Sequence, residues 1–218
     1  MLAEKLLSGS TGSSTLYVDD VFSTWLYTGN GSTQTITNGI DLSTNGGLVW
    51  IKQRNQAFDN VLTDTARGNN YYLVSNTTAA QVNLTNQITS FNSDGFSLGN
   101  IVQTNDSGWP IVSWTFRKQA KFFDVVTYTG TGSSGLTINH NLGSVPGCII
   151  IKNYDPGNTD WTVYHTSLGT SKYLQLDVSD SSILSYPDVA TVLSDPAQRI
   201  QNNFTLNISD TQANIANN

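Results

Sequence analysis

Apolar residues along the chain fall in short runs that have the period of β-strands rather than of helices. They alternate with polar residues over Val112–Phe116 and over Leu174–Val178, which predicts strands with one buried and one solvated face. Leu48–Ile51 and Cys148–Ile151 are continuous apolar runs, each followed by a Lys, and such runs are typical of central strands buried on both faces. Beyond Leu2–Leu7 no segment has a convincing helical period, so we expect an all-β protein.

The pattern of the first half recurs about 100 positions later, and we interpret the recurrence as a duplication. The unit has the size of a small sandwich, which predicts two tandem β-sandwich (jelly-roll-like) repeats at residues 24–117 and 118–218, after an N-terminal segment at residues 1–23. The matched pairs, at offsets of 100 to 108 positions, are "LYTGNGS" (Leu26–Ser32) with "TYTGTGS" (Thr127–Ser133), "GGLVWIKQRN" (Gly46–Asn55) with "PGCIIIKNYD" (Pro146–Asp155), "TARGNNYYLV" (Thr65–Val74) with "TSLGTSKYLQ" (Thr166–Gln175), and "GFSLGN" (Gly95–Asn100) with "NFTLNI" (Asn203–Ile208).

The register between the copies predicts that the second copy lacks its last strand. In the first copy "GFSLGN" leads to the alternating strand "WPIVSWTF" (Trp109–Phe116), whereas "NFTLNI" leads to Asn218, where such a strand would begin. We expect the 218 residues to be an N-terminal fragment of a protein that continues with a similar strand. If the chain is whole, a neighbour would supply the strand by β-augmentation, with "TLYV" (Thr15–Val18) the first candidate.

Composition and charge narrow the function classes. Charged residues make up 12% of the chain, the net charge is -6 and the pI is about 4.6, and no basic stripe exists, so we expect no nucleic-acid partner. No apolar run approaches the ~18 residues of a membrane span, so we expect no membrane insertion. Cys148 is the single cysteine, which excludes a disulfide within the chain, and its place in an apolar run favours a small core residue over a nucleophile.

The remaining titratable residues give no catalytic pattern. His140 and His165 have no zinc-ligand spacing around them, and no nucleophile elbow or phosphate loop occurs, so we expect no enzyme activity and no cofactor. Asp155 and Asp160 flank a turn that could bind calcium, but the acidic ligands are too sparse and a solvated turn is the favoured interpretation. Trp161 and Tyr164 are candidate glycan contacts, because aromatic faces beside Asn and Asp stack on sugars, although core packing explains such rings more simply.

The segment before the first copy has two open interpretations. Leu2, Leu6 and Leu7 form an apolar group ahead of the Gly/Ser-rich "GSTGSS" (residues 9–14). An apolar group on a flexible spacer is typical of a docking element, and equally of a frayed terminus.

The motifs "YTGxGS", a Gly-bounded "IIIK" run, "DWTVYHTSLG" followed by "YLQLDV", "GFSLGN" and "IVSWTF" resemble a domain repeated in tail fibres and other virion structural proteins of tailed phages, especially cyanophage-type marine phages. The resemblance covers about Thr24–Asn218, although the first copy departs from it at "NVLTDTARG" (Asn60–Gly68). These domains have no assigned catalytic residues, so no site is implied.

The resemblance implies a virion structural protein, the particle-proximal N-terminal part of a tail fibre that mediates attachment to the tail and host adsorption. It implies a homotrimer whose partners are tail, adaptor or baseplate proteins, and a host surface glycan as a further partner. Leu2, Leu6 and Leu7 would then attach the chain to the particle. Two alternatives stay open, namely a head fibre or capsid decoration protein, and a carbohydrate-binding module.

Overall fold

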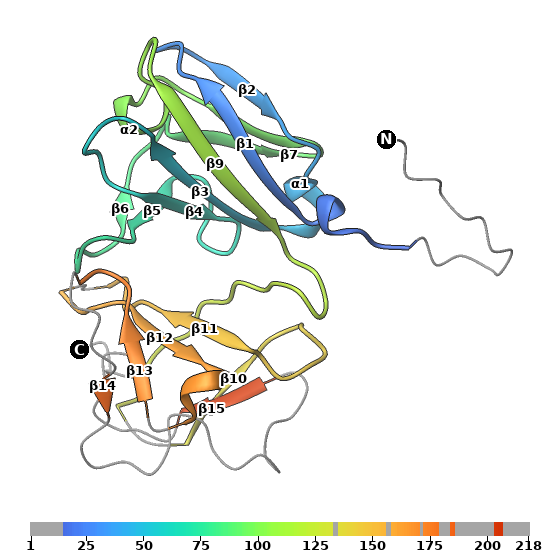
Figure 1. Ribbon diagram of the computed structural model, residues 1–218, viewed down its shortest axis with the longest axis vertical. Helices are drawn as coiled ribbons and strands as arrows, with labels where there is room; N and C mark the ends of the chain where they lie inside the picture. The colour runs from blue at the N-terminus through green and yellow to red at the C-terminus, as the bar shows by residue number, and fades with distance from the viewer. Residues whose placement is uncertain are drawn as a thin grey trace, which may run out of the picture.

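The protein is described from a computed structural model, whose two halves lie one above the other along its long axis (Figure 1). The residues that the structure describes are 15–132, 135–155, 158–170, 172–178, 184–185 and 203–206. The attachment residues Leu2, Leu6 and Leu7 lie outside these ranges.

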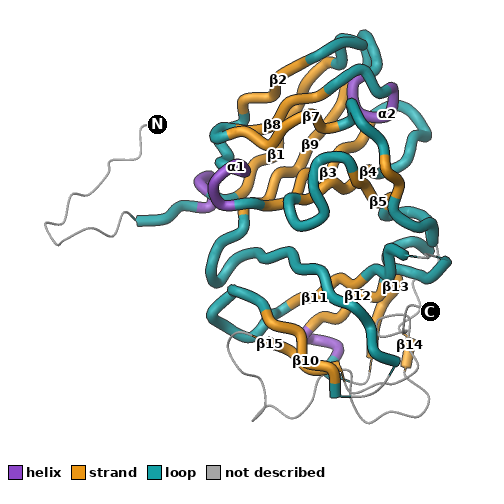
Figure 2. Tube along the Cα trace, turned by 180° about the vertical axis from the view of Figure 1, so that it is seen from behind, coloured by secondary structure: helices purple, strands orange, loops and turns teal. Residues whose placement is uncertain are grey.

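The protein is all-β, as predicted, and its first half is a β-sandwich. One sheet has six strands in the order β1-β9-β3-β4-β5-β6, and the other has three in the order β2-β8-β7, with antiparallel pairing throughout. Figure 2 shows the two layers face to face. The elements of this half are η1 (Val18–Asp20), β1 (Phe22–Thr28), β2 (Gln34–Thr37), α1 (Leu42–Asn45), β3 (Gly47–Gln53), β4 (Val61–Asp64), β5 (Tyr71–Val74), β6 (Val82–Asn83), β7 (Ile88–Asn92), β8 (Gly95–Leu98), α2 (Val102–Asn105) and β9 (Pro110–Arg117).

The core of the sandwich forms because alternate residues of the facing strands point inward. Val49 and Ile51 of β3 and Ile111 of β9 meet Phe96 and Leu98 of β8 in one buried cluster. The opposite face of the six-stranded sheet is covered as well: Leu62 of β4 and Leu73 of β5 are buried against Trp161 of the second half. The continuous apolar run of β3 is therefore a central strand covered on both sides, as predicted.

The loop of the first "YTGNGS" motif is fixed by a buried asparagine. Asn105 accepts a hydrogen bond from the Asn30 backbone N–H at 3.0 Å, and its amide group donates to the Gly99 carbonyl at 2.7 Å. A side chain at Gly29 would stand 2.1 Å from the Asp106 carbonyl oxygen, so only glycine fits. What the two copies of the motif share is a left-handed glycine, at Gly31 and Gly132.

The second half repeats several strand pairings of the first. β10 pairs with β15 as β2 pairs with β8. A four-stranded sheet has the order β11-β12-β13-β14, which is the same order as that of the corresponding strands β3-β4-β5-β6 in the first half. The elements are β10 (Leu136–Asn139), β11 (Cys148–Ile151), β12 (Thr162–His165), η2 (Thr166–Leu168), β13 (Lys172–Gln175), β14 (Leu184–Ser185) and β15 (Asn203–Leu206).

Two strand predictions for the second half are wrong. β11 is the edge of its sheet among the described residues, so Cys148 is exposed and Ile150 is 48% exposed instead of being buried on both faces. β13 ends at Gln175, and Leu176 and Val178 beyond it are exposed, because the chain has left the sheet before their alternation can face a core.

Candidate functional site

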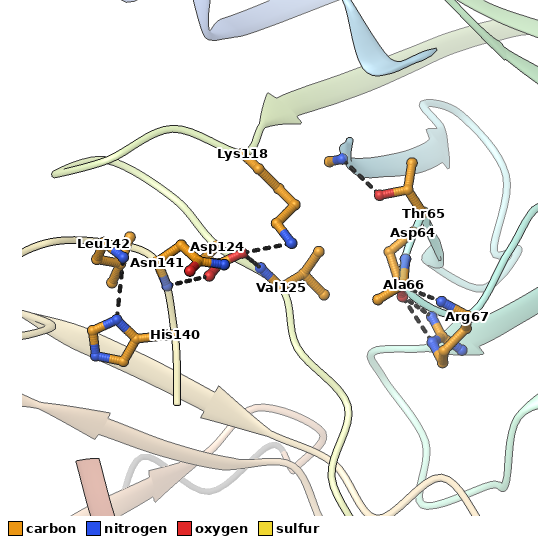
Figure 3. Close-up of polar contacts among 11 residues, drawn as sticks. Asp64, Thr65, Ala66, Arg67, Lys118, Asp124, Val125, His140, Asn141 and Leu142 are labelled. Atoms are coloured by element: carbon orange, nitrogen blue, oxygen red, sulfur yellow. Dashed lines mark hydrogen bonds and ion pairs between the residues drawn. The ribbon is translucent and has the colours of Figure 1, made fainter. Parts of the chain in front are cut away.

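Both histidines close turns of the second half. His140 Nδ1 accepts a hydrogen bond from the Leu142 backbone N–H at 3.2 Å, as Figure 3 shows, and His165 Nδ1 accepts one from the Ser167 backbone N–H at 3.2 Å. A ring nitrogen that accepts from an N–H carries no proton, so the neutral imidazole has its proton on Nε2. Each ring thus has a structural task at a turn.

The first half uses shorter side chains in the corresponding turns. Asn38 Oδ1 accepts a hydrogen bond from the Ile40 backbone N–H at 3.2 Å, and Asp64 Oδ1 accepts one from the Ala66 backbone N–H at 3.0 Å. Side-chain acceptors of this kind hold a turn by replacing a backbone carbonyl. The same local task performed by Asn, Asp and His explains why the histidines align with an amide and a carboxylate.

The turn between Asp155 and Asp160, for which a solvated turn is favoured over a calcium site, uses one of its two carboxylates locally. Asp160 Oδ2 accepts a hydrogen bond from Gln175 Nε2 at 2.5 Å, and the Asp155 backbone N–H donates to Asn153 Oδ1 at 3.2 Å. Throughout the described ranges, no group of three or more His, Cys, Asp or Glu side chains could hold a metal ion.

The two aromatic candidates for glycan contact lie inside the protein. Trp161 is 5% exposed and donates from Nε1 to the Val74 carbonyl across the two halves at 3.0 Å. Tyr164 of β12 is 3% exposed. Neither ring offers a face to a ligand in solvent, although Trp161 does line the cavity described next.

An apolar cavity of about 750 Å³ lies between the two halves. One wall is the outer face of the six-stranded sheet, where Leu48 and Trp50 of β3 lie. The second wall is the linker segment Phe122–Tyr128, and the third is β11 with the residues that follow it. A cavity of this size is in the range of ligand-binding pockets, and its walls are largely aromatic and aliphatic.

Two ion pairs border the cavity. Arg67 Nη2 lies 2.5 Å from Asp64 Oδ2 with both side chains buried, and Lys118 Nζ lies 2.9 Å from Asp124 Oδ1 across the start of the linker (Figure 3). Asp124 also accepts a hydrogen bond from the Asn141 backbone N–H at 2.7 Å. Asp124 therefore ties the linker to the first half on one side and to the second half on the other.

The lysine that closes each apolar run holds the loop that follows it. Lys52 Nζ donates to the carbonyl oxygens of Gln56 and Phe58, at 2.8 and 2.6 Å. Lys152 Nζ donates to the Thr159 carbonyl at 2.7 Å and also to the Thr78 carbonyl of the first half, at 2.9 Å. Burial lowers the pKa of Lys152, against the opposing effect of two nearby aspartates. The sequence shows a lysine at the end of each apolar run, but this role depends on the path of the following loop, which the run does not indicate.

Two walls of the cavity correspond in sequence to β1 and β3. The linker segment Phe122–Tyr128 contains the counterpart of β1, 101 positions later, and β11 is the counterpart of β3, 100 positions later. In the first half β9 lies between β1 and β3 and pairs with both. In the second half, within the described residues, β11 pairs only with β12 and the linker forms no strand. We call the space between Phe123–Tyr128 and β11 the strand slot.

Cys148 borders the strand slot and has no activated thiol. The residue is exposed at the end of β11, and partial desolvation of the thiol raises its pKa. A thiol with a raised pKa is mostly protonated near neutral pH and is a poor nucleophile. The prediction that Cys148 is a buried core residue is wrong, because no strand covers this side of β11 among the described residues.

Comparison with known proteins places the chain in a family. Residues 18–217 match the family described as a domain of unknown function (DUF7483), and the chain belongs to it. No curated protein and no solved structure matches the chain. None of the helices in the described part of the chain is both long and apolar enough to cross a membrane.

Proposed function

We propose that the chain is a structural protein of a bacteriophage virion, the particle-proximal part of a tail fibre, which serves assembly and host adsorption. Its two halves would be copies of one β-sandwich unit. The observation that carries the proposal is the strand slot beside β11, a sheet edge bordered by apolar walls. Exposed sheet edges recruit further strands, so such an edge suits a protein that works by binding other polypeptides.

The duplication is supported by details that a shared fold alone would not require. Lys52, near the end of β3, and Lys152, directly after β11, hold equivalent loops, and the turn-capping side chains recur at aligned positions. The glycines Gly31 and Gly132 of the repeated motif both have φ of 67°, a left-handed conformation that favours glycine. Gly68 and Gly169, after the aligned turns, likewise have positive φ.

The exposed apolar residues next to the N-terminal segment fit an attachment role. Leu16, Tyr17 and Val18 are 46, 50 and 68% exposed and precede β1. Consecutive large apolar residues on a surface mark an interaction site when a partner covers them. In a fibre, this segment and residues 1–14 would dock on the particle.

Localisation of the chain in purified particles tests the proposal. Gold-labelled antibodies against the chain are viewed by electron microscopy on particles of the phage that encodes it. They should bind each tail fibre at the end that is attached to the particle. If the label is confined to the head, the chain is a head fibre or decoration protein and not part of a tail fibre. Absence of the chain from purified particles by mass spectrometry, together with binding of the free chain to host glycans, would overturn the proposal in favour of a carbohydrate-binding module.

A further inference from the structure

The first half shows which strand lies beside β3, at a position whose counterpart beside β11 holds no strand within the described ranges. β9 lies between β1 and β3, and it pairs antiparallel over seven residues with each of them. Its outward residues cover the neighbouring strand: Trp114 lies directly opposite Trp50, with ring centroids 6.1 Å apart in an edge-to-face arrangement. Its inward residues Ser113 and Thr115 are fully buried in the sandwich.

The second half retains both neighbours of such a strand. Phe123 and Tyr128 stand 101 positions after Phe22 and Tyr27 of β1, and both line the cavity together with the four residues of β11. Residues 123–126 and Tyr128 are only partly exposed, so this stretch of the linker lies against the protein, and burial raises the pKa of the Tyr128 hydroxyl to about 12. The linker and β11 therefore border a space with the same two sides as the position of β9.

The glycine at the start of β3, and its counterpart before β11, lie beside the same space. A Cβ atom at Gly47 would stand 2.0 Å from the Phe116 carbonyl oxygen of β9, so this position must be glycine where a strand is present. The counterpart Gly147 has no atom within 4 Å of the corresponding Cβ position. The second half thus keeps the glycine that a neighbouring strand requires, and none of the residues that the structure describes occupies the space that the strand would use.

The exposure of side chains along β11 agrees with the absence of a second neighbouring strand among the described residues. Ile150, the counterpart of Trp50, is 48% exposed, although the run Cys148–Ile151 has the composition of a central strand. An apolar edge strand of this kind exposes unpaired backbone groups as well as apolar surface.

We propose that the strand slot binds an extended segment of another polypeptide chain, patterned like β9, which pairs antiparallel with β11. The occupant has large apolar residues on alternate positions, facing Cys148 and Ile150, and small hydroxyl residues between them, as Trp114 and Phe116 alternate with Thr115 in β9. Main-chain hydrogen bonds to β11 provide affinity, and the apolar walls select the alternating side chains. This inference rests on the proposed assembly role and names the chemistry of the partner.

A peptide derived from the chain itself tests the inference. A fluorescent peptide with the sequence of Trp109–Arg117 is titrated into the full 218-residue chain, and binding is followed by anisotropy. Hydrogen exchange with mass spectrometry then reports on the amides of Cys148–Ile151. We expect saturable binding and at least tenfold slower exchange at these amides when the peptide is bound, with no change at β3. A peptide with Pro in place of Trp114 should not bind, because proline removes a ladder donor and clashes in the strand.

The matched variant Gly147→Ala separates the strand slot from any other binding site. Its methyl group meets no atom of the described residues, but it would lie where the carbonyl of an incoming strand must pass, so binding should weaken at least tenfold with stability unchanged. Lys172→Gln, on the exposed part of β13, is the control and should bind normally. Equal binding by Gly147→Ala, no binding of the peptide at all, or slow exchange of Cys148–Ile151 in the free chain would each overturn the proposal. Because the assay uses only purified chain and peptide, it can fail while the chain is still found in the virion.

Discussion

Trp161 joins the two halves, and its removal gives a direct measure of how strongly they are coupled. The side chain is 5% exposed, packs on Leu62 and Leu73, and donates a hydrogen bond to the Val74 carbonyl at 3.0 Å. Trp161→Ala removes the ring and the donor together, whereas Trp161→Phe keeps most of the apolar contact and loses the donor.

The expected magnitudes follow from these contacts. Truncation of a buried tryptophan costs about 3–5 kcal/mol of the free energy of unfolding. Loss of the donor alone leaves the partly buried Val74 carbonyl without this hydrogen bond, so Trp161→Phe should cost about 1–3 kcal/mol. Trp25 on the outer strand β1 is 41% exposed, and Trp25→Ala, the matched control, should cost about 1 kcal/mol or less.

Urea unfolding followed by fluorescence and far-UV circular dichroism measures these differences, and a double-mutant cycle with Leu73→Ala isolates the contact between the halves. Residues in contact give interaction energies of about 0.5–3 kcal/mol, and we expect a value within that range. A coupling energy near zero, or a cost of Trp161→Ala no larger than that of Trp25→Ala, would refute the view that this ring holds the halves together.

Four further outcomes are expected. Deletion of residues 2–12 should abolish incorporation into particles while circular dichroism of the chain stays unchanged; normal incorporation would contradict the attachment role. Sedimentation of the intact protein should give a trimer, and a monomer or dimer would count against the fibre proposal. Gly29→Ala should destabilise the first half by more than about 2 kcal/mol in urea, because its methyl group would stand 2.1 Å from the Asp106 carbonyl oxygen. The hydrogen bond from the Thr44 backbone N–H lowers the pKa of Asp41, so the contribution of this carboxylate to stability is present above the unfolded pKa of about 4 and is lost as pH falls through the lower folded value. Asp41→Asn should remove this part of the acid dependence of stability. An unchanged dependence of stability on pH would argue against the role of Asp41 as the N-cap of α1.

The strands could be predicted because their signals are local. The run at Leu48–Ile51 and the alternation at Val112–Phe116 depend only on the residues themselves, and β3 and β9 lie where these patterns indicate. In the second half the strand at Cys148–Ile151 also lies where the pattern indicates, but the counterpart of β1 forms no strand and the alternating run at Leu174–Val178 leaves the sheet after Gln175.

The burial of those strands could not be read from the same signals. Cys148–Ile151 has the composition of a central strand, yet its exposure depends on whether another strand lies beside it, and that is decided by residues far away in sequence. Trp161 has the surroundings of a sugar-binding ring in the sequence, but it is buried by leucines about 90 positions earlier. The ion pair of Lys118 and Asp124 likewise needs the path of the linker, which composition does not provide.

The pairing of β1 with β9 has a consequence for how such a chain can grow. Phe22 lies directly opposite Phe116, so the first half starts and finishes on neighbouring strands at one corner of its larger sheet. Proteins whose termini are adjacent tolerate the insertion of whole domains, because the added chain leaves and returns at one point. A gene segment that encodes this unit can therefore be copied in tandem without opening the sheets of the original unit. Each added unit would be connected to the rest of the chain at a single place on its surface.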